Sequence, residues 1–305
     1  MHVRELTTGD GQNARRLWDD LGGWYRNTSP TGDADVDRAI GRLIRQSVSG
    51  RRPRRGAPAD GGWVAESGGK IIGWLYARTD PDQNYIIPLV PPEETSGALD
   101  ALLSPARAWF AEQQTDKFVV DVPVSRPDLR ALAERTGRAL WHRAVLDRDL
   151  TPFPTGSPLP ATVREFRRPD LPTVQALFDR RHPEKPPAPI PVAFLELRGS
   201  WGRDPAWELQ RAILLAGPRQ QLLGVAGGTH RPHAPIGFLG PWVLAEATSP
   251  PVATELLGAV VSWLRGVGAQ RVRTTVPTPP GADARMLLSS GFSTMAESDL
   301  YELKS

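Results

Sequence analysis

The sequence predicts an α/β (α+β) chain in which one mixed unit of strands and helices occurs twice in tandem. Three observations support this fold class. Two segments 160 residues apart share one pattern, each is followed by a hairpin pattern, and a proline-rich stretch separates the two series. With 305 residues, of which 40% are apolar and 23% charged, the chain is long enough for two cores of ordinary size.

The first element of each copy is a short strand that leads into an amphipathic helix. Segment 3–20 reads VRELTTGDGQNARRLWDD, and segment 163–180 reads VREFRRPDLPTVQALFDR. Asp10 and Asp170 stand where a helix N-cap is expected, because an Asp side chain accepts hydrogen bonds from free amides of the first turn. Apolar residues then recur at helical spacing: Ala14, Leu17, Trp18 and Leu21 in the first copy, and Val174, Leu177 and Phe178 in the second.

A hairpin and a strand–elbow–helix segment come next in both copies. Residues 63–77 and 214–228 each contain two β-rich runs joined by a tight polar turn. A further strand, NYIIPLV at 84–90 and GFLGPWV at 237–243, then runs through an elbow into a long helix. Some large aromatic residues fall on apolar helix faces, where we expect core packing: Trp18, Trp109 and Trp263.

Each copy ends with a strand, a helix and a final strand pair. The helices close on Gly137 and Gly291, which suit a helix C-cap. The final strand pairs are expected at 139–150 and 292–303, one pair for each copy.

These patterns predict the domain limits. We expect a first domain over 1–150, a linker over 151–160 and a second domain over 161–305. The linker, TPFPTGSPLP, is rich in proline, which stiffens a chain and does not fit inside a sheet.

Composition excludes several classes of function. The chain has no cysteine, so disulfides, thiolate nucleophiles and cysteine metal sites are excluded, and its five histidines have no ligand spacing. We therefore expect no metal. No stretch approaches the roughly 18 apolar residues of a membrane helix, and the first residues show no signal pattern. We expect a cytoplasmic protein without membrane contact.

The charge pattern leaves two interpretations open. A net charge of +3 is too small to make the whole chain a nucleic-acid binder. Four arginines nevertheless lie within residues 51–56, RRPRRG. This segment is interpreted either as a solvated loop or as an anion site for a nucleotide phosphate, a tRNA or an acidic partner.

The order of elements resembles the GNAT acyltransferase fold, repeated twice. The likeness is carried by the VxExxxxD openings and by a set of matched positions: Gly73 and Gly224 in the hairpins, the strand ends 88–90 and 241–243, and SSGF at 289–292. It implies two tandem GNAT-like domains, each a mixed, mostly antiparallel central sheet flanked by helices. It also implies an acyl-CoA-dependent N-acyltransferase that passes an acetyl group from acetyl-CoA, or another acyl group, to an amine of a small molecule or peptide.

The resemblance places the donor site at the strand end and elbow of the second copy. In that family the strand before the elbow separates from its neighbour, its free backbone groups bind the pantetheine arm, and the elbow holds the diphosphate. The corresponding residues here are Trp242, Val243, Leu244, Thr248, Ser249, Val252, Ala253 and Thr254. Pro250 and Pro251 begin the helix well but remove two amide donors from this end.

The first copy matches the donor pattern less well. Its elbow is about one residue short, and only Gly97 fits the family's glycine positions. Glu93 and Glu94 place negative charge beside its amides, which disfavours a phosphate. We therefore expect the first copy to be degenerate and the second to be the working one.

Three residues are candidates for acid–base catalysis. Glu246 follows the second copy's strand and is the candidate base by position, although a carboxylate there also suits the helix dipole. His233 lies in the loop between the third and fourth strands, and His182 lies in the segment that shapes acceptor specificity in the resembling family. Either histidine has the alternative interpretation of a solvated loop residue. In many family members a Tyr acts as the general acid, whereas this chain has Leu287 and Ala133 at the two equivalent positions.

Two further functions remain open. The altered elbows and the missing Tyr favour a non-catalytic GNAT-fold module that binds acyl-CoA or regulates a partner. The arginines at 51–56 point to a Fem-like aminoacyl-tRNA-dependent transferase, and only this alternative implies a nucleic acid, tRNA, as partner.

Overall fold

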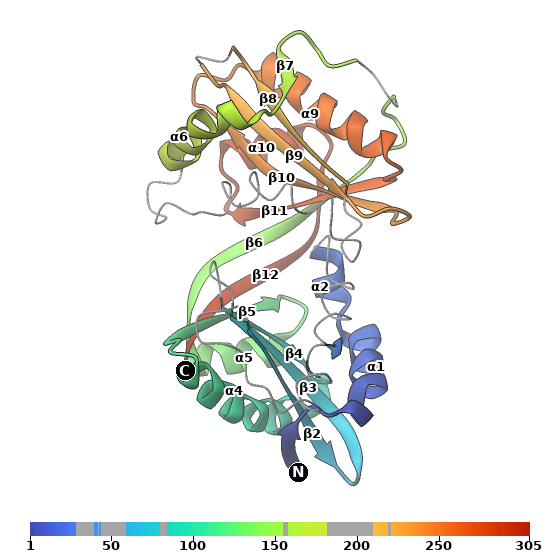
Figure 1. Cartoon of the computed structure of the whole chain (residues 1–305), viewed down its shortest axis with the longest axis vertical. Coiled ribbons are helices and arrows are strands. Elements are labelled where there is room, and N and C mark those ends of the chain that lie inside the picture. The colour runs from blue at the N-terminus through green and yellow to red at the C-terminus, as the bar shows by residue number, and fades with distance from the viewer. Residues whose placement is uncertain are drawn as a thin grey trace. The chain divides into compact units, whose positions relative to one another are not determined.

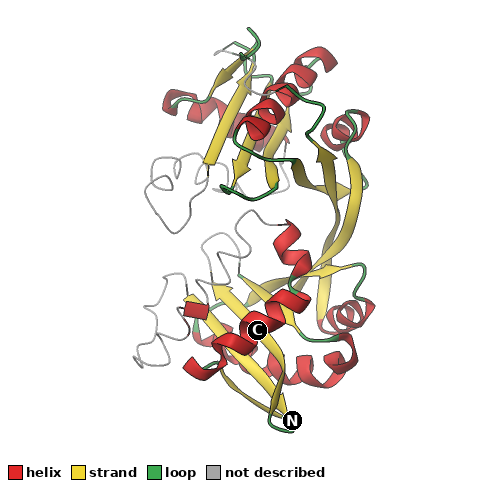
Figure 2. Ribbon diagram, turned by 90° about the vertical axis from the view of Figure 1, so that its right-hand side faces the viewer, coloured by secondary structure: helices red, strands yellow, loops and turns green. Residues whose placement is uncertain are grey.

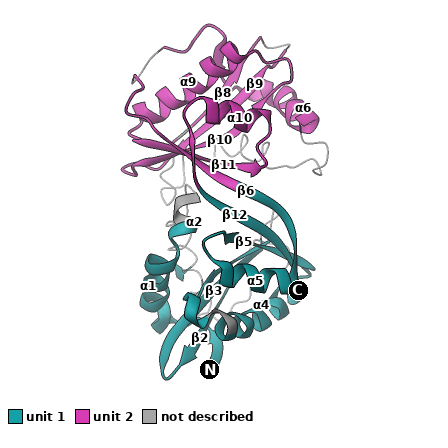
Figure 3. Ribbon diagram, turned by 180° about the vertical axis from the view of Figure 1, so that it is seen from behind, with its two compact units in different colours: residues 1–27, 32–143, 296–305 teal, residues 28–31, 144–295 magenta. Residues whose placement is uncertain are grey.

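The computed structural model describes residues 1–28, 40–41, 43, 59–79, 84–154, 158–181, 210–218 and 221–305. The chain divides into two compact units (Figure 3). Unit 1 comprises residues 1–27, 32–143 and 296–305, and unit 2 comprises residues 28–31 and 144–295. Each unit has a mixed, mostly antiparallel sheet with flanking helices, which confirms the predicted fold class.

The sheet of unit 1 has the strand order β1-β2-β3-β4-β5-β12-β6. Its strands are β1 (His2–Glu5), β2 (Ala59–Ser67), β3 (Lys70–Thr79), β4 (Tyr85–Leu89), β5 (Lys117–Pro123), β12 (Ser293–Lys304) and β6 (Gly137–Asp149). β4 and β5 run parallel, whereas β1–β2, β2–β3, β3–β4 and β5–β12 are antiparallel. The predicted β2–β3 hairpin turns through Gly68 and Gly69, whose φ values of 56° and 77° favour glycine.

Helices cover both faces of this sheet (Figure 2). They are α1 (Gly11–Leu21), α2 (Gly23–Thr28), α4 (Asp100–Glu112) and α5 (Pro127–Thr136), with short turns η1 (Thr8–Asp10), η2 (Pro92–Glu94) and η3 (Thr95–Leu99). Leu17 and Trp18 of α1 share a core with Trp74 of β3, whereas Leu75 shares the opposite core with Leu102 of α4. Neighbouring residues of one strand thus serve opposite faces.

Unit 2 repeats the arrangement in the strand order β6-β11-β10-β9-β8-β7. Its own strands are β7 (Val163–Glu165), β8 (Gln210–Ala216), β9 (Gly224–His230), β10 (Ile236–Leu244) and β11 (Arg271–Thr278). β10 and β11 run parallel, and the β7–β8, β8–β9 and β9–β10 pairs are antiparallel.

The helices of unit 2, labelled in Figure 1, also contribute residues to two cores. They are α6 (Leu171–Arg181), α9 (Pro250–Gly266) and α10 (Ala282–Ser289), with the short turn η4 (Arg168–Asp170). Leu256 and Val260 of α9 pack with Ala226 of β9, and Leu177 of α6 packs with Val225 on the other face. Trp18 is fully buried and Trp109 and Trp263 pack against the cores, as predicted.

The last strand differs from the sequence prediction. Each copy was expected to end in its own strand pair, but β12 pairs with β5, from Ser298 opposite Pro123 to Lys304 opposite Lys117. β6 lies next to β11 in unit 2. The two segments carry similar alternating patterns, so sequence alone does not say which sheet each one completes. The predicted domain limits, 1–150 and 161–305, follow the repeated sequence pattern. The compact units have other limits, because residues 144–150 belong to unit 2 and residues 296–305 belong to unit 1.

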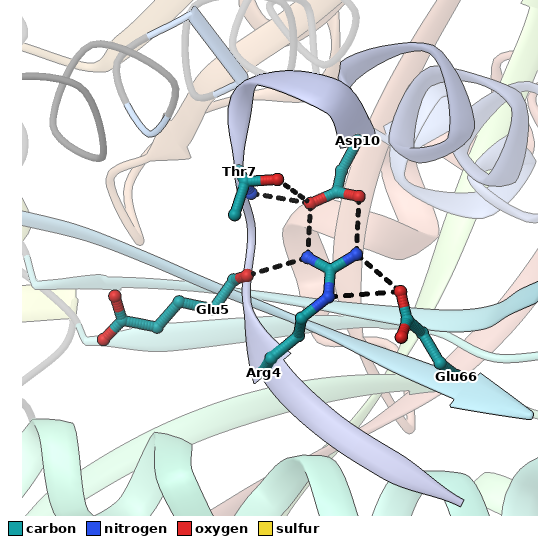
Figure 4. Close-up of polar contacts among 5 residues, drawn as sticks. All are labelled: Arg4, Glu5, Thr7, Asp10 and Glu66. Carbon is teal, nitrogen blue, oxygen red and sulfur yellow. Dashed lines mark hydrogen bonds and ion pairs between the residues drawn. The ribbon is translucent and has the colours of Figure 1, made fainter. Parts of the chain in front are cut away.

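An arginine–aspartate contact recurs at the start of both copies. Arg4 Nη1 lies 2.6 Å from Asp10 Oδ2, which also accepts the backbone N–H of Thr7 at 2.7 Å (Figure 4). Arg164 Nη1 lies 2.8 Å from Asp170 Oδ2 in the same way. Asp10 stands at the N-cap of α1, as expected, but its side chain bonds backwards to the strand and turn instead of the helix amides. The aspartate therefore joins the first strand to the first helix.

Candidate functional site

The strand before the elbow separates from its parallel neighbour in both units. β10 is paired with β11 only over residues 236–238, which lie opposite residues 271–273, but β10 continues to Leu244 along β9. β4 is paired with β5 only at residues 85 and 86 and continues to Leu89. From Leu239 onward, one edge of β10 is therefore not used in pairing with β11.

The free edge of β10 ends at a carboxylate. Ala245 donates its N–H to Leu223 O on the β9 side at 2.8 Å. Because successive amides of a paired strand point to opposite sides, the N–H of Leu244 points away from β9. It donates to Asp283 Oδ2 at 3.3 Å, and the Trp242 indole N–H donates to the backbone oxygen of Asp283 at 3.2 Å. The first turn of α10 is thus attached to the separated edge.

Asp283 belongs to a small charged cluster. Its Oδ1 lies 3.1 Å from Arg181 Nη2 at the end of α6, and Arg181 Nη1 lies 4.0 Å from Glu246 Oε1. The Glu246 side chain is 91% exposed, whereas that of Asp283 is 24% exposed. Asp283 was not predicted as a site residue, because an acid in the first turn of a helix looks like an ordinary dipole partner.

The elbow forms the helix start that its prolines predict. Ser249 is the N-cap of α9, with extended backbone angles, and Pro250 and Pro251 are the first two helical residues. The first hydrogen bond of helical spacing runs from Ala253 N–H to Ser249 O, at 3.1 Å. The N–H of Val252, one residue earlier, therefore has no acceptor within the helix, as is usual for the first amides of a helix.

Two of the three elbow hydroxyls bond to the backbone. Thr248 Oγ1 donates to Leu223 O, and Thr254 Oγ1 donates to Pro250 O at 2.9 Å. Ser249 is exposed, and its hydroxyl makes no capping bond. The hydroxyl of Ser249 is therefore the one of these three that remains available to a phosphate.

An open groove of about 430 Å³ adjoins the elbow. Val252 and Leu223 line it from the elbow side, and Thr162 and Arg164 line it near and on β7. Arg164 pairs with Asp170, but its buried Nε has no hydrogen-bond partner among the described residues. Arg164 and Val252 thus line one groove, while the Arg164 guanidinium is bonded to Asp170 at the start of α6, a contact that sequence reasoning missed.

Comparison with known proteins decides the fold. No protein-family model and no curated protein matches the sequence. Among solved structures, a tandem GNAT protein from the clavulanic acid biosynthesis pathway, without AcCoA, matches with a TM-score of 0.65 and 16% identity over 99% of this chain and 98% of that one. This chain has a tandem GNAT fold.

Two other solved structures are also similar to this chain. A GCN5-related N-acetyltransferase from Sphaerobacter thermophilus has a TM-score of 0.61 and 16% identity over 99% of this chain and 95% of that one. A putative acetyltransferase from Pyrococcus horikoshii has a TM-score of 0.52 and 15% identity over 100% and 89%, respectively. At these identities the likeness shows the fold.

The GNAT unit formed by the second copy does not bring all predicted catalytic residues together. Glu246 lies at the elbow end of β10, whereas exposed His233 lies in the turn before Ile236, the other end of that strand. A strand of this length extends roughly 30 Å. His233 lines a separate open groove of about 490 Å³. His182 and the arginine segment 51–56 lie outside the described residues.

In the GNAT unit formed by the first copy, apolar side chains fill the space beside the separated strand. Ile86, Val120 and Leu129 are among those lining a cavity of about 10 Å³ there, room for about one water molecule. Arg126 Nη2 donates to Val90 O at 2.8 Å and pairs with Asp128 at 2.6 Å. The edge of this copy is therefore closed.

The same unit carries buried and partly buried polar contacts that were not predicted from the sequence. Tyr76 donates to Asp60 at 2.5 Å, and burial holds the pKa of Tyr76 well above its usual value. Trp24 Nε1 donates to Asp121 Oδ2 at 2.8 Å, and Arg143 forms an ion pair with the same carboxylate. These contacts lie within unit 1 and connect its strands to one another and to α2.

Across the described ranges, no three His, Asp or Glu side chains are grouped so that they hold a metal ion. Within that same part of the chain, every helix is too short or too polar to span a bilayer.

Proposed function

We propose that the chain is an acyl-CoA-dependent N-acyltransferase that takes its donor in unit 2 and acetylates an amine of a small molecule or peptide. The observation that supports this most is the separation of β10 from β11 after Phe238, directly before a helix start, within a GNAT fold. An unpaired strand edge offers an extended, amide-containing arm the hydrogen bonds of a missing strand. The helix start offers the positive end of its dipole to a diphosphate.

The proposed donor-binding residues follow the edge and the elbow: Trp242, Val243, Leu244, Thr248, Ser249, Val252, Ala253 and Thr254. The N–H of Leu244 already takes an oxygen acceptor on the separated side, which fits a carbonyl of the donor arm. Ser249 and Val252 contribute a hydroxyl and an amide at the elbow.

Arg164, which lines the groove beside Val252, is the proposed replacement for part of what the prolines remove. Two missing amide donors cost about 3–6 kcal/mol of phosphate binding, because a hydrogen bond to a charged group is worth about 1.5–3 kcal/mol. A guanidinium–phosphate hydrogen bond, formed when Arg164 turns from Asp170 toward the groove, is worth about 1.5–3 kcal/mol. The groove that Arg164 shares with Val252 supports this assignment.

The chemistry needs a proton acceptor near the end of β10. When bound, acyl-CoA supplies a thioester, whose C–S bond breaks as the C–N bond to the amine forms. Glu246 is the proposed base: its solvated carboxylate accepts the amine proton, directly or through one water. The departing thiolate takes a proton from solvent, since buried Leu287 stands at the expected acid's position. His182 and His233 stay predictions for the acceptor side.

Calorimetric titration with acetyl-CoA tests this proposal. We expect binding by the wild type, and tighter binding, by about tenfold, for Pro251→Gly, which restores one amide donor. Pro92→Gly is the matched control in the elbow of unit 1 and is expected to leave the affinity unchanged. Absence of acetyl-CoA binding by both the wild type and Pro251→Gly contradicts the proposal.

A non-catalytic acyl-CoA-binding module is the second candidate. It is favoured by buried Leu287 and Ala133, neither of which can donate a proton to a thiolate. Release of free CoA thiol with a panel of amines separates the candidates: the transferase releases thiol with some amine, whereas the binding module binds acetyl-CoA and releases none.

A further inference from the structure

We propose that Asp283 is a latch on the donor edge of unit 2: its carboxylate occupies the N–H of Leu244, and a donor binds only when this contact opens. The inference rests on the proposed function, since it concerns the same strand edge. It adds a residue that controls how readily the site accepts a donor.

The position of Leu244 makes its amide important for an incoming arm. Leu244 is the last residue of β10, and the elbow begins with the next residue, Ala245. A donor whose diphosphate lies at the start of α9 and whose arm runs back along β10 meets this N–H first. Asp283 Oδ2 lies 3.3 Å from that nitrogen, so the carboxylate and a donor carbonyl compete for one hydrogen.

The contact is suited to opening. Its length of 3.3 Å is beyond the usual 2.9–3.0 Å of an N–H···O bond, so it is weaker than most. The Asp283 side chain is 24% exposed, so water can replace the lost acceptor or donor. Asp283 also keeps its ion pair with Arg181, at 3.1 Å, after it releases Leu244, and its charge is therefore not left unpaired.

The same region of unit 1 is closed by different chemistry. There Arg126 donates to the carbonyl of Val90 and pairs with Asp128, and apolar side chains fill the remaining space. Removal of Asp128 leaves this filling in place. Removal of Asp283 instead leaves an N–H without its acceptor on the separated side of β10.

Three variants test the latch by calorimetry with acetyl-CoA. Asp283→Ala removes the competing oxygen, and we expect it to bind acetyl-CoA about tenfold or more tightly than the wild type does. Asp283→Asn keeps an amide oxygen that accepts from Leu244, so we expect a smaller gain. Asp128→Ala, the matched acid in the first turn of α5, is expected to leave the affinity unchanged. Thermal unfolding by circular dichroism verifies that each variant is folded.

The outcomes separate the two proposals. If the wild type and folded Asp283→Ala bind acetyl-CoA equally, the latch is wrong and the proposed function stands. If neither binds it, the proposed function is wrong, and the latch is wrong with it. If Asp128→Ala binds acetyl-CoA more tightly than the wild type does and Asp283→Ala does not, the assignment of the donor to unit 2 is wrong. If Asp283→Ala is unfolded, Asp283→Asn decides. The latch is wrong if Asp283→Asn and the wild type bind acetyl-CoA with equal affinity and acetyl-CoA leaves the exchange of the Leu244 amide unchanged.

Discussion

Arg4 donates hydrogen bonds to both carboxylate oxygens of Asp10, at 2.6 and 2.8 Å. These bonds lower the pKa of the Asp10 carboxyl to about 2. A carboxylate whose pKa is lower in the folded than in the unfolded chain stabilises the fold above its unfolded pKa. This contribution is lost as the pH falls through the folded pKa.

We therefore predict that Asp10→Asn lowers the free energy of unfolding by about 2 kcal/mol at pH 7. The difference from the wild type should shrink between pH 4 and pH 2, the range set by the two pKa values. Urea unfolding across this range measures it. Asp19→Asn, in an exposed pair with Arg15, is the control and should cost under about 1 kcal/mol. Equal losses for the two variants would contradict the prediction.

The exchanged last strand predicts which unit a core substitution weakens. Leu303 of β12 is buried in unit 1, and Leu146 of β6 is buried in unit 2. Either change to Ala should cost about 2–5 kcal/mol. Hydrogen–deuterium exchange should show faster exchange in β5 for Leu303→Ala and in β11 for Leu146→Ala. The reverse pattern would mean that each copy keeps its own last strand.

The groove beside the elbow predicts a role for Arg164 in donor affinity. Arg164→Ala should weaken acetyl-CoA binding by about tenfold or more, because one charge-assisted hydrogen bond is lost. Arg4→Ala removes the equivalent arginine–aspartate contact in unit 1 and serves as the structural control. Equal affinities of the two variants would contradict a role for Arg164 in donor binding.

Much of the fold is predictable from local pattern. The hairpins, the helix start at Pro250 and the buried helix faces follow from residues close in sequence. The matched glycines have a packing reason: a Cβ on Gly224 would lie 2.9 Å from Leu256, and one on Gly73 would lie 3.0 Å from Val90. In both copies a small residue lets the segment after the fourth strand approach the sheet.

Relations between distant residues were not predictable. Asp283 and Leu244 lie far apart in the sequence, and no spacing rule connects an acid in one helix to the last amide of a strand. The partner of β12 depends on a choice between two similar sheets. A role of Arg164 in donor binding was not predicted, because its contact with Asp170 already gives it a structural role.

Hydrogen–deuterium exchange of the wild type with and without acetyl-CoA tests most directly where the donor binds. Donor binding along β10 and the elbow should slow exchange in the peptide that covers residues 239–254. Exchange in the corresponding segment of unit 1, residues 86–99, should stay unchanged. Slower exchange confined to residues 86–99, or no change in either segment at saturating acetyl-CoA, would contradict a donor site in unit 2.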